Sequence, residues 1–361
     1  MTTVSETDVL EALKAVTDPD LGRDIVSLGF IKELDICDGH VAFSIELTTP
    51  ACPVKDQMRD QAHMLVSGLG GVTNVDVRMT ASVRSATVPG SDRSPIPGVK
   101  NIIAIGAGKG GVGKTTVSVN VAVALAQCGG RVGMIDGDVY GPNVPIMLGI
   151  DAQLSTEDKK IVPAEKHGIR VVSMGFLTDS KAPIIWRGPM LHGVIRQFFQ
   201  DVRWGELDYL VVDMPPGTGD VALSLSQTVP VTGAILVTTP QTVALSDTGR
   251  AVGMYRKLNV PTLGLIENMS YYHCPGCQRE SDLFGKGGGE RMAVELGVPF
   301  LGQVPIYEPI RVGGDTGVPI VISEPESAAA QAFLQTAERV AAQISIASYE
   351  TQSPSSSVTV S

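Results

Sequence analysis

A glycine-rich segment around residue 110 constrains the fold of this chain more than any other feature. It reads, in order, Gly108, Lys109, Gly110, Gly111, Val112, Gly113, Lys114, Thr115 and Thr116. An apolar run at 102–105 precedes it and predicts a buried strand, and an alanine- and valine-rich run at 117–127 follows it and predicts a helix. Because glycines lack the Cβ atoms that would hold the backbone away from an anion, the loop and the helix N-terminus can bind phosphate groups. Strand, loop and helix in this order predict a nucleoside triphosphate site rather than a chance glycine-rich turn.

Side chains in and beyond the loop complete the predicted nucleotide site. Lys114 is placed to reach the β- and γ-phosphates, and Thr115 to hold Mg²⁺. A second apolar run, 209–212, predicts another buried strand and ends in Asp213. Since open α/β sheets bind ligands at the carboxyl ends of their strands, Asp213 is predicted to hold Mg²⁺, through water.

A third strand end carries two more carboxylates. The run 131–135 predicts a short buried strand, and Asp136-Gly137-Asp138 follows it directly. An isolated aspartate more often caps a helix or a turn. Three strand ends in the order that P-loop proteins use favour a nucleotide site over three unrelated caps.

Lys109 narrows the class of nucleotide-binding protein. The segment matches the pattern K-G-G-x-G-K-T-[ST], and the chain thereby resembles the deviant P-loop family, which includes nitrogenase iron protein, the MinD and ParA ATPases, and the Mrp/ApbC iron–sulfur carriers. The resemblance implies that Lys109 crosses a dimer interface to the partner's nucleotide, a role comparable to that of an arginine finger. It also implies that Asp138 orients or activates the attacking water. The alternative for Lys109 is an ordinary solvated loop lysine.

The nucleotide base is predicted to be adenine. The guanine-specific pattern N-K-x-D does not occur, and the predicted strand at 262–266 is followed by Glu267-Asn268-Met269-Ser270. In the deviant P-loop family an asparagine at this place contacts adenine, so the resemblance makes Asn268 the candidate. An asparagine at a strand end is also an ordinary turn residue.

A cysteine pair, Cys274-Pro275-Gly276-Cys277, lies just beyond Asn268. A turn can bring both sulfurs to one side, but two thiols are half of the four ligands that zinc or a cubane cluster normally takes. A symmetric dimer would supply the same pair twice and so complete the set. A redox disulfide and a zinc half-site are the alternatives for this pair.

Four motifs in order make the chain similar to the Mrp/ApbC branch over nearly all of 99–340. They are Asp136 to Asn143, Trp186-Arg187-Gly188-Pro189-Met190, Asp213 to Asp220, and the cysteine motif. This resemblance implies a doubly wound, mostly parallel α/β P-loop domain that binds and hydrolyses ATP with Mg²⁺. It further implies a homodimer that bridges a [4Fe-4S] cluster on Cys274 and Cys277. Iron–sulfur scaffold proteins and apoproteins that receive the cluster are the implied partners.

The amino-terminal part predicts a separate small α+β domain. Helical runs at 7–16 and 54–67 and strand runs at 30–36, 41–47 and 72–79 surround a hairpin signal at Asp38-Gly39. The proline-, glycine- and serine-rich stretch 85–98 predicts a linker. Asp18-Pro19-Asp20 and the stretch from Thr48 to Pro53 make this region similar to SufT-like iron–sulfur assembly domains. The predicted domains are therefore 1–84 and 99–345, with a serine- and threonine-rich disordered tail at 346–361.

Cys52 is the residue of chemical interest in the amino-terminal domain. Pro53 suits the first position of a helix, so Cys52 is predicted at the N-cap, where exposed N–H groups lower the pKa of a thiol. A reactive thiolate that relays or docks a cluster is one interpretation. A small buried apolar residue is the other.

Charge and cysteine content limit the remaining possibilities. A net charge of −10 argues against nucleic acid as a partner, and the apolar runs are too short to cross a membrane. Five cysteines do not form a disulfide framework, and the acidic first residues lack a signal peptide, so a cytoplasmic protein is expected.

The leading hypothesis is an ATP-dependent iron–sulfur cluster carrier. A MinD- or ParA-like positioning ATPase is the main alternative, and an electron-donating reductase similar to nitrogenase iron protein is a third. The cysteine pair favours the carrier. The predicted last helix, 327–344, has Arg339 as its one basic residue and so lacks the basic face of a membrane anchor.

Overall fold

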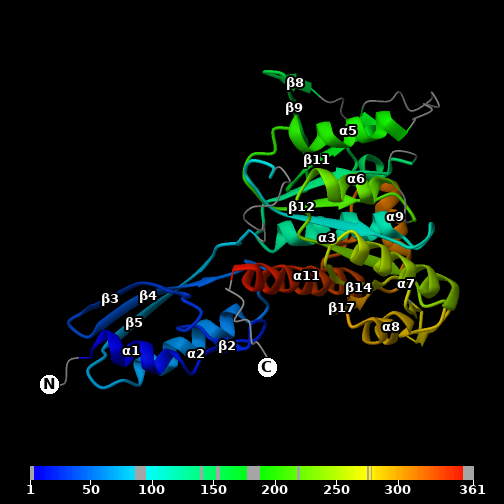
Figure 1. The fold of residues 1–361 in the computed structure, drawn as a ribbon. Helices are drawn as coiled ribbons and strands as arrows, with labels where there is room; N and C mark the ends of the chain where they lie inside the picture. Colours follow the sequence, from blue (N-terminus) through cyan, green and yellow to red (C-terminus); the bar gives the residue numbers. More distant parts are fainter. Residues whose placement is uncertain are drawn as a thin grey trace, which may run out of the picture.

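Two β-sheets organise the chain in the computed structural model (Figure 1). A three-stranded sheet lies in the amino-terminal part, and an eight-stranded sheet forms the centre of the larger domain. The structure describes residues 4–85, 95–138, 141–151, 155–176, 188–217, 220–274, 276–277 and 279–352. Most of the predicted linker (86–94), Trp186, Arg187 and Pro275 lie outside these ranges.

The small amino-terminal domain has the predicted α+β composition. Its elements are α1 (Glu6–Leu13), β1 (Thr17–Asp18), β2 (Arg23–Asp24), β3 (Ile31–Cys37), β4 (His40–Leu47), α2 (Lys55–Ser67) and β5 (Asn74–Ala81). Strands β3 and β4 form the predicted antiparallel hairpin, and β5 pairs with β4 in parallel. Asp38 and Gly39 both have positive φ at the turn, 49° and 80°, and a Cβ atom on Gly39 would lie 2.6 Å from the carbonyl oxygen of Gly71. The turn therefore requires glycine at this position.

The strands of the larger domain follow the order of a doubly wound sheet. The order is β10-β11-β7-β12-β6-β13-β14-β17, and within the described ranges all pairs are parallel except β10 with β11. These strands are β6 (Val99–Gly106), β7 (Val132–Asp136), β10 (Ala164–Lys166), β11 (Ile169–Ser173), β12 (Leu207–Asp213), β13 (Gly233–Thr238), β14 (Thr262–Glu267) and β17 (Phe300–Gln303). The predicted fold class is confirmed.

Helices cover both faces of this sheet (Figure 1). They are α3 (Lys114–Gln127), α4 (Val144–Leu148), α5 (Gly188–Gln200), α6 (Asp220–Thr228), α7 (Thr242–Lys257), α8 (Gly288–Leu296), α9 (Glu308–Thr316), α10 (Ile320–Ser323) and α11 (Ala328–Gln352). The remaining strands are β8 (Ser155–Glu157), β9 (Lys160–Val162), β15 (Tyr272–His273) and β16 (Glu280–Ser281), and a 3₁₀ turn spans Met174–Phe176.

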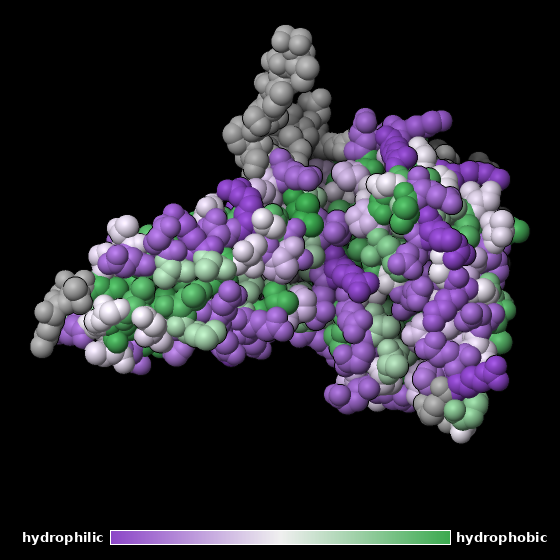
Figure 2. Space-filling model, turned by 90° about the horizontal axis from the view of Figure 1, so that it is seen from below, coloured by the Kyte–Doolittle hydropathy of each residue, from purple (hydrophilic) through white to green (hydrophobic). Residues whose placement is uncertain are grey.

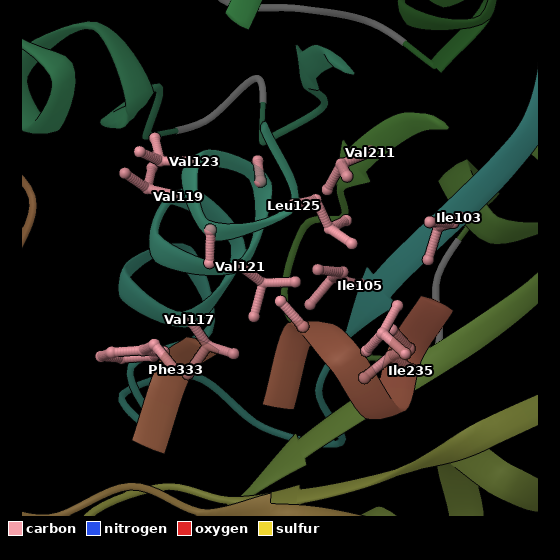
Figure 3. Packing of buried hydrophobic residues seen from close by; sticks show 14 of the residues in the cluster. Ile103, Ile105, Val117, Val119, Val121, Val123, Leu125, Val211, Ile235 and Phe333 are labelled. Atoms are coloured by element: carbon pink, nitrogen blue, oxygen red, sulfur yellow. The ribbon is translucent and has the colours of Figure 1, made fainter. Parts of the chain in front are cut away.

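Helix α3 is buried along most of its length, which fits the spread of its valine, alanine and leucine residues over more than one face. It lies between the sheet and α11, and Figure 3 shows Phe333 of α11 beside Val117 of α3. Ile105 of β6 and Leu125 of α3 lie in the same apolar cluster. The helix that begins at the glycine-rich loop is therefore held firmly from both sides.

The last helix is longer than the sequence predicts. It continues to Gln352, so residues 346–352 are helical where a disordered tail was predicted to begin. Its final turns reach the amino-terminal domain: Arg23 donates a hydrogen bond to the Tyr349 hydroxyl, and its guanidinium carbon lies 5.7 Å from the centre of the Tyr349 ring. This contact orders turns whose composition alone favours disorder.

A second contact between the domains is buried. The Thr49 hydroxyl lies 3.1 Å from the hydroxyl of Tyr209 in β12, and Ala51 belongs to the apolar cluster of the larger domain. The stretch from Thr48 to Pro53, which carried the SufT resemblance, thus lies where the two domains meet. Figure 2 shows the amino-terminal domain as a narrower lobe beside the larger domain, with hydrophobic residues gathered along its middle.

Asp208 connects three neighbouring strands near their amino ends, on the side of the sheet opposite the nucleotide loop. It accepts from Lys100 at the start of β6 (2.9 Å) and from the Arg131 backbone and guanidinium before β7 (2.9–3.1 Å). Burial by itself raises the pKa of Asp208, but the hydrogen bonds from Arg131 and then Lys100 outweigh it and lower the pKa to about 2.

Asp208→Asn is expected to lower the free energy of unfolding by about 1–3 kcal/mol near neutral pH. The folded pKa lies below the unfolded value, so the carboxylate stabilises the fold above the unfolded pKa and loses this contribution as pH falls through about 4 to about 2. Urea unfolding of both proteins near pH 7 and again at the lowest pH where both fold should show the difference shrinking. Equal midpoints at neutral pH would contradict the assignment.

Candidate functional site

The glycine-rich loop connects β6 to α3 in the predicted way. Gly113 is the N-cap of α3 with φ of 76°, and Gly111 has φ of 81°. A Cβ atom on Gly108 would lie 2.3 Å from the backbone of Asp247 in α7, so the loop can approach that helix only with glycine there. The loop's conformation and its position at a helix N-terminus fit the binding of phosphate groups.

Asp213 lies at the centre of a buried polar network. Its carboxylate is fully buried and accepts from the Lys114 ammonium (2.7 Å), the Thr115 hydroxyl (2.8 Å) and the Ser118 hydroxyl (2.6 Å). The structure thus brings Asp213 into contact with Lys114 and Thr115, which lie 99 and 98 residues earlier in the sequence. Ser118 was missed, although its position one helical turn after Lys114 is a usable signal.

This network fits a site for Mg²⁺ and phosphate. The hydroxyl of Thr115 and the carboxylate of Asp213 are hard oxygen donors 2.8 Å apart, which is the ligand type that Mg²⁺ prefers, directly or through water. Lys114 balances the buried charge of Asp213 in the structure. In a nucleotide complex, the Lys114 ammonium would bind the phosphates instead of Asp213. The metal ion would then neutralise the Asp213 carboxylate.

Asp136 is buried beside Asp213, because the two residues are register partners at the ends of β7 and β12. Burial, and then the charge of Asp213, raise the pKa of Asp136 to about 7. It accepts from the Ser173 hydroxyl (2.9 Å) and from the backbone N–H groups of Asp138 and Val144 (3.2 Å each). Asp136 therefore shapes the segment that carries Asp138.

A pocket of about 750 Å³ opens over the loop. Its lining includes Lys109, Thr116, Asp138 and Asn268, which the sequence placed at the nucleotide site. Lys109 is exposed at the rim, and within the described part of the chain it forms no ion pair. Its ammonium group is therefore available to a ligand or to a second protein chain.

Asn268 lines the pocket but is mostly buried, because its side chain is held against the glycine-rich loop. Its side chain donates to the carbonyl oxygen of Val112 (2.9 Å), and its backbone N–H donates to Thr238 (2.8 Å). A Cβ atom on Gly113 would lie 2.3 Å from the side-chain nitrogen of Asn268. Position 113 therefore requires glycine while the Asn268 side chain occupies this place. Asn268 thus positions the loop, whatever contact it makes with a base.

The cysteine pair lies in the turn of the hairpin formed by β15 and β16. Cys274 is half-buried and Cys277 is exposed, and both are free thiols. Backbone N–H groups of Cys277 and Gly276, and then the Cys277 side chain, lower the pKa of Cys274. Such N–H donors stabilise a thiolate, which is the form that binds metal. Within the described ranges, no three or more histidine, cysteine, aspartate or glutamate side chains lie close enough together to hold a metal ion.

The hairpin is fastened beside the nucleotide pocket. The backbone N–H of Ile306 donates to the carbonyl of Tyr271 (2.6 Å), and Ile306 bridges Tyr272 while also lining the pocket. Leu283 and Phe284, which follow β16, line the same pocket. The two predicted functional elements are therefore neighbours in space.

The predicted N-cap position of Cys52 is wrong. Helix α2 begins at Lys55, and its N-cap is Val54, two residues after Cys52. Cys52 is buried in the core of the amino-terminal domain, and burial raises its pKa to about 11. Burial outweighs the hydrogen bond that the Val54 N–H gives the Cys52 sulfur, so the environment favours the packing alternative over a reactive thiolate.

The doubly wound sheet, the glycine-rich loop with Lys109 and the buried Lys114–Asp213 pair define a P-loop NTPase of the deviant, MinD-like class. The model of the family described as "NUBPL iron-transfer P-loop NTPase" matches residues 98–341, and that of "Iron-sulfur cluster assembly protein" matches residues 6–77. The chain belongs to the iron-transfer P-loop NTPase family and carries an amino-terminal iron–sulfur assembly domain. The resemblance to Mrp/ApbC carriers with a SufT-like domain is confirmed.

Known proteins resemble the chain over most of its length. An "Iron-sulfur cluster carrier protein" of Synechocystis is 51% identical over 346 residues, which cover 94% of this chain and 98% of that protein. A nucleotide-binding protein of Archaeoglobus fulgidus in complex with ADP has a TM-score of 0.56 at 35% identity, covering 62% of this chain and 88% of its own. The MinD protein of Pyrococcus horikoshii with Mg-ADP has a TM-score of 0.51 at 28% identity, covering 66% and 94%. None of the helices in the described ranges has the length and apolar character needed to cross a bilayer.

Proposed function

We propose that this protein is an ATP-dependent iron–sulfur cluster carrier that holds a [4Fe-4S] cluster across a homodimer and transfers it to apoproteins. The observation that carries the proposal is the cysteine hairpin fastened beside the nucleotide pocket. A pair of free thiols next to a nucleotide site gives ATP a way to act on the cargo.

The nucleotide half of the proposal rests on the buried network. Lys114 would bind the β- and γ-phosphates, Thr115 and Asp213 would hold Mg²⁺, and Asp138 in the pocket lining would orient the attacking water. Lys109 would reach the partner's nucleotide from the rim, where its ammonium group is exposed. Two solved relatives with ADP support an adenine nucleotide as the ligand.

The cluster half rests on ligand number and on the state of the thiols. One chain supplies two thiolates, and a two-fold axis would supply the four that a cubane cluster takes. The N–H groups around Cys274 favour the thiolate form before any metal binds. The close relative named as an iron–sulfur cluster carrier supports cluster transfer as the activity.

For the domain arrangement we infer an assembly domain at 1–84, a linker at 85–98 and an ATPase domain that begins at 99. The contacts of Thr49 with Tyr209 and of Arg23 with Tyr349 hold the two domains together. The assembly domain would then meet scaffold or recipient proteins while the ATPase domain holds the cargo.

Reconstitution and transfer test this function together. Protein incubated with iron and sulfide without oxygen should bind about four iron atoms per dimer, with the absorption of a [4Fe-4S] cluster. The loaded protein should then activate an apo-acceptor, and Mg–ATP should change the transfer rate. A preparation that binds zinc instead of iron, or a cluster that never leaves, would contradict the proposal.

A further inference from the structure

Glu267 is a fully buried carboxylate at the end of β14, immediately before Asn268. Its Oε1 atom accepts from the Ser270 hydroxyl and from the backbone N–H of Gly287 (2.9 Å). Its Oε2 atom accepts from the backbone N–H of Gly289 (2.5 Å). One side chain thus binds residues on both sides of a long intervening segment.

The surroundings of Glu267 are built for a negative charge. In the ranges that the structure describes, it forms no ion pair with a lysine or an arginine. Its charge instead faces the N-terminus of α8, where the N-cap Gly287 and the second helical residue Gly289 point N–H groups at it. A buried carboxylate without such donors would be strongly unfavourable.

The glycine run 287–289 makes this approach possible. Gly287 has φ of 74°. A Cβ atom on Gly288 would lie 2.7 Å from the carbonyl oxygen of Pro240, and one on Gly289 would lie 3.0 Å from the Cβ of Glu267. These three glycines allow the N-terminus of α8 to approach the Glu267 carboxylate closely. Neither the nucleotide site nor the cysteine pair explains their presence.

The segment between these contacts touches the nucleotide loop and contains the cysteine hairpin. It starts at Asn268, which holds the nucleotide loop through Val112, and it contains the hairpin with Cys274 and Cys277. Glu267 closes this segment at its base by joining its beginning, at Ser270, to its end, at Gly287. Because the two ends of the segment are joined through Glu267, a displacement of Asn268 would be transmitted to the cysteine hairpin.

We propose that Glu267 is a positioning residue that joins the nucleotide pocket and the cysteine hairpin into one mechanical unit, so that nucleotide binding alters the exposure of the two thiols. The inference deepens the proposed function, since it concerns how ATP acts on the cargo site. It requires nucleotide binding but no cluster, because the thiols themselves report the coupling.

Thiol alkylation in the cluster-free, full-length protein tests this coupling. Iodoacetamide modification of Cys274 and Cys277 is followed by mass spectrometry with and without saturating Mg–ADP, and the exposed Cys37 is the internal reference. In the unmodified protein, Mg–ADP is expected to change both rates by about fivefold relative to Cys37. In Glu267→Gln, whose amide presents N–H groups to the N–H donors of α8, the change is expected to fall below about twofold at saturating nucleotide.

Matched variants separate positioning from stability. Glu290→Gln changes an exposed glutamate in the same first turn of α8 and should respond to Mg–ADP as the unmodified protein does. Ala293→Gly destabilises α8 without touching the carboxylate, and it should also keep the response. Ser270→Ala removes one donor to Glu267 and should give an intermediate response, which keeps the test decisive if Glu267→Gln fails to fold.

Calorimetry of Mg–ADP binding identifies which hypothesis has failed. If the unmodified protein binds Mg–ADP and its thiols do not respond, the coupling is refuted. A normal response in a Glu267→Gln protein that binds Mg–ADP would refute the role of Glu267. Neither result depends on cluster reconstitution, so a failure of the carrier function is recognised separately.

Discussion

Lys114→Ala is expected to weaken Mg–ATP binding by about 100-fold or more, because it removes charge-assisted contacts to the β- and γ-phosphates. It should also destabilise the fold by about 3 kcal/mol, since the fully buried carboxylate of Asp213 would keep its hydroxyl donors but lose its cation. Calorimetry of nucleotide binding and urea unfolding of the nucleotide-free protein measure the two effects separately. Full ATP affinity in this variant would contradict the site.

Lys109→Ala is the matched control for this prediction. Lys109 is an exposed loop lysine, so its removal should leave stability and most nucleotide affinity intact while hydrolysis is lost. Mixed dimers of Lys109→Ala with Asp138→Ala subunits test whether it acts on the partner's nucleotide. In the mixed dimer, one of the two nucleotide sites would contain Asp138 from one subunit and Lys109 from the other. ATPase activity should therefore exceed that of either parent dimer. Activity no higher than in the parents would refute action across the interface.

Replacing either cysteine of the pair should abolish stable cluster binding. Cys274→Ser or Cys277→Ser removes one thiolate from each chain. The dimer then lacks half of the thiolate ligands that a cubane cluster takes. Iron content after anaerobic reconstitution is expected to fall to near background, while Mg–ATP affinity stays within about threefold, because neither cysteine lines the nucleotide pocket. Iron and sulfide analysis with calorimetry on the same samples measures both quantities.

Cys37→Ser provides the control for a general loss of thiols. Cys37 is also an exposed free cysteine, but it lies in β3 of the amino-terminal domain. This variant should reconstitute like the unmodified protein. A full iron complement in Cys274→Ser or Cys277→Ser would refute a cluster bridged by this pair.

Much of the fold was predictable because its signals are local. Apolar runs as short as 209–212 predicted strands of the central sheet, and Asp38-Gly39 predicted the hairpin turn that β3 and β4 form. The last helix was predicted too short, because its final turns are ordered by Arg23 from a distant part of the chain. Composition cannot report such a contact.

The candidate site divides in the same way. Lys114, Thr115 and Asp213 were recognised because motif spacing marks them, and the structure joins them in one network. Ser118 was missed because no motif names it, although helical spacing places it on the same face. Cys52 was misplaced because Pro53 suggested a helix start that the structure puts at Lys55.

The sequence by itself determined the class of this protein, because the phosphate-binding loop, the cysteine pair and the short motifs of the assembly domain each depend on the spacing of a few neighbouring residues. Only the tertiary structure decided how these parts act on one another. Glu267 and Gly287 meet because β14 and α8 pack together, and Thr49 meets Tyr209 because the domains dock. Such contacts depend on how whole helices and strands pack together, so no local sequence pattern predicts them.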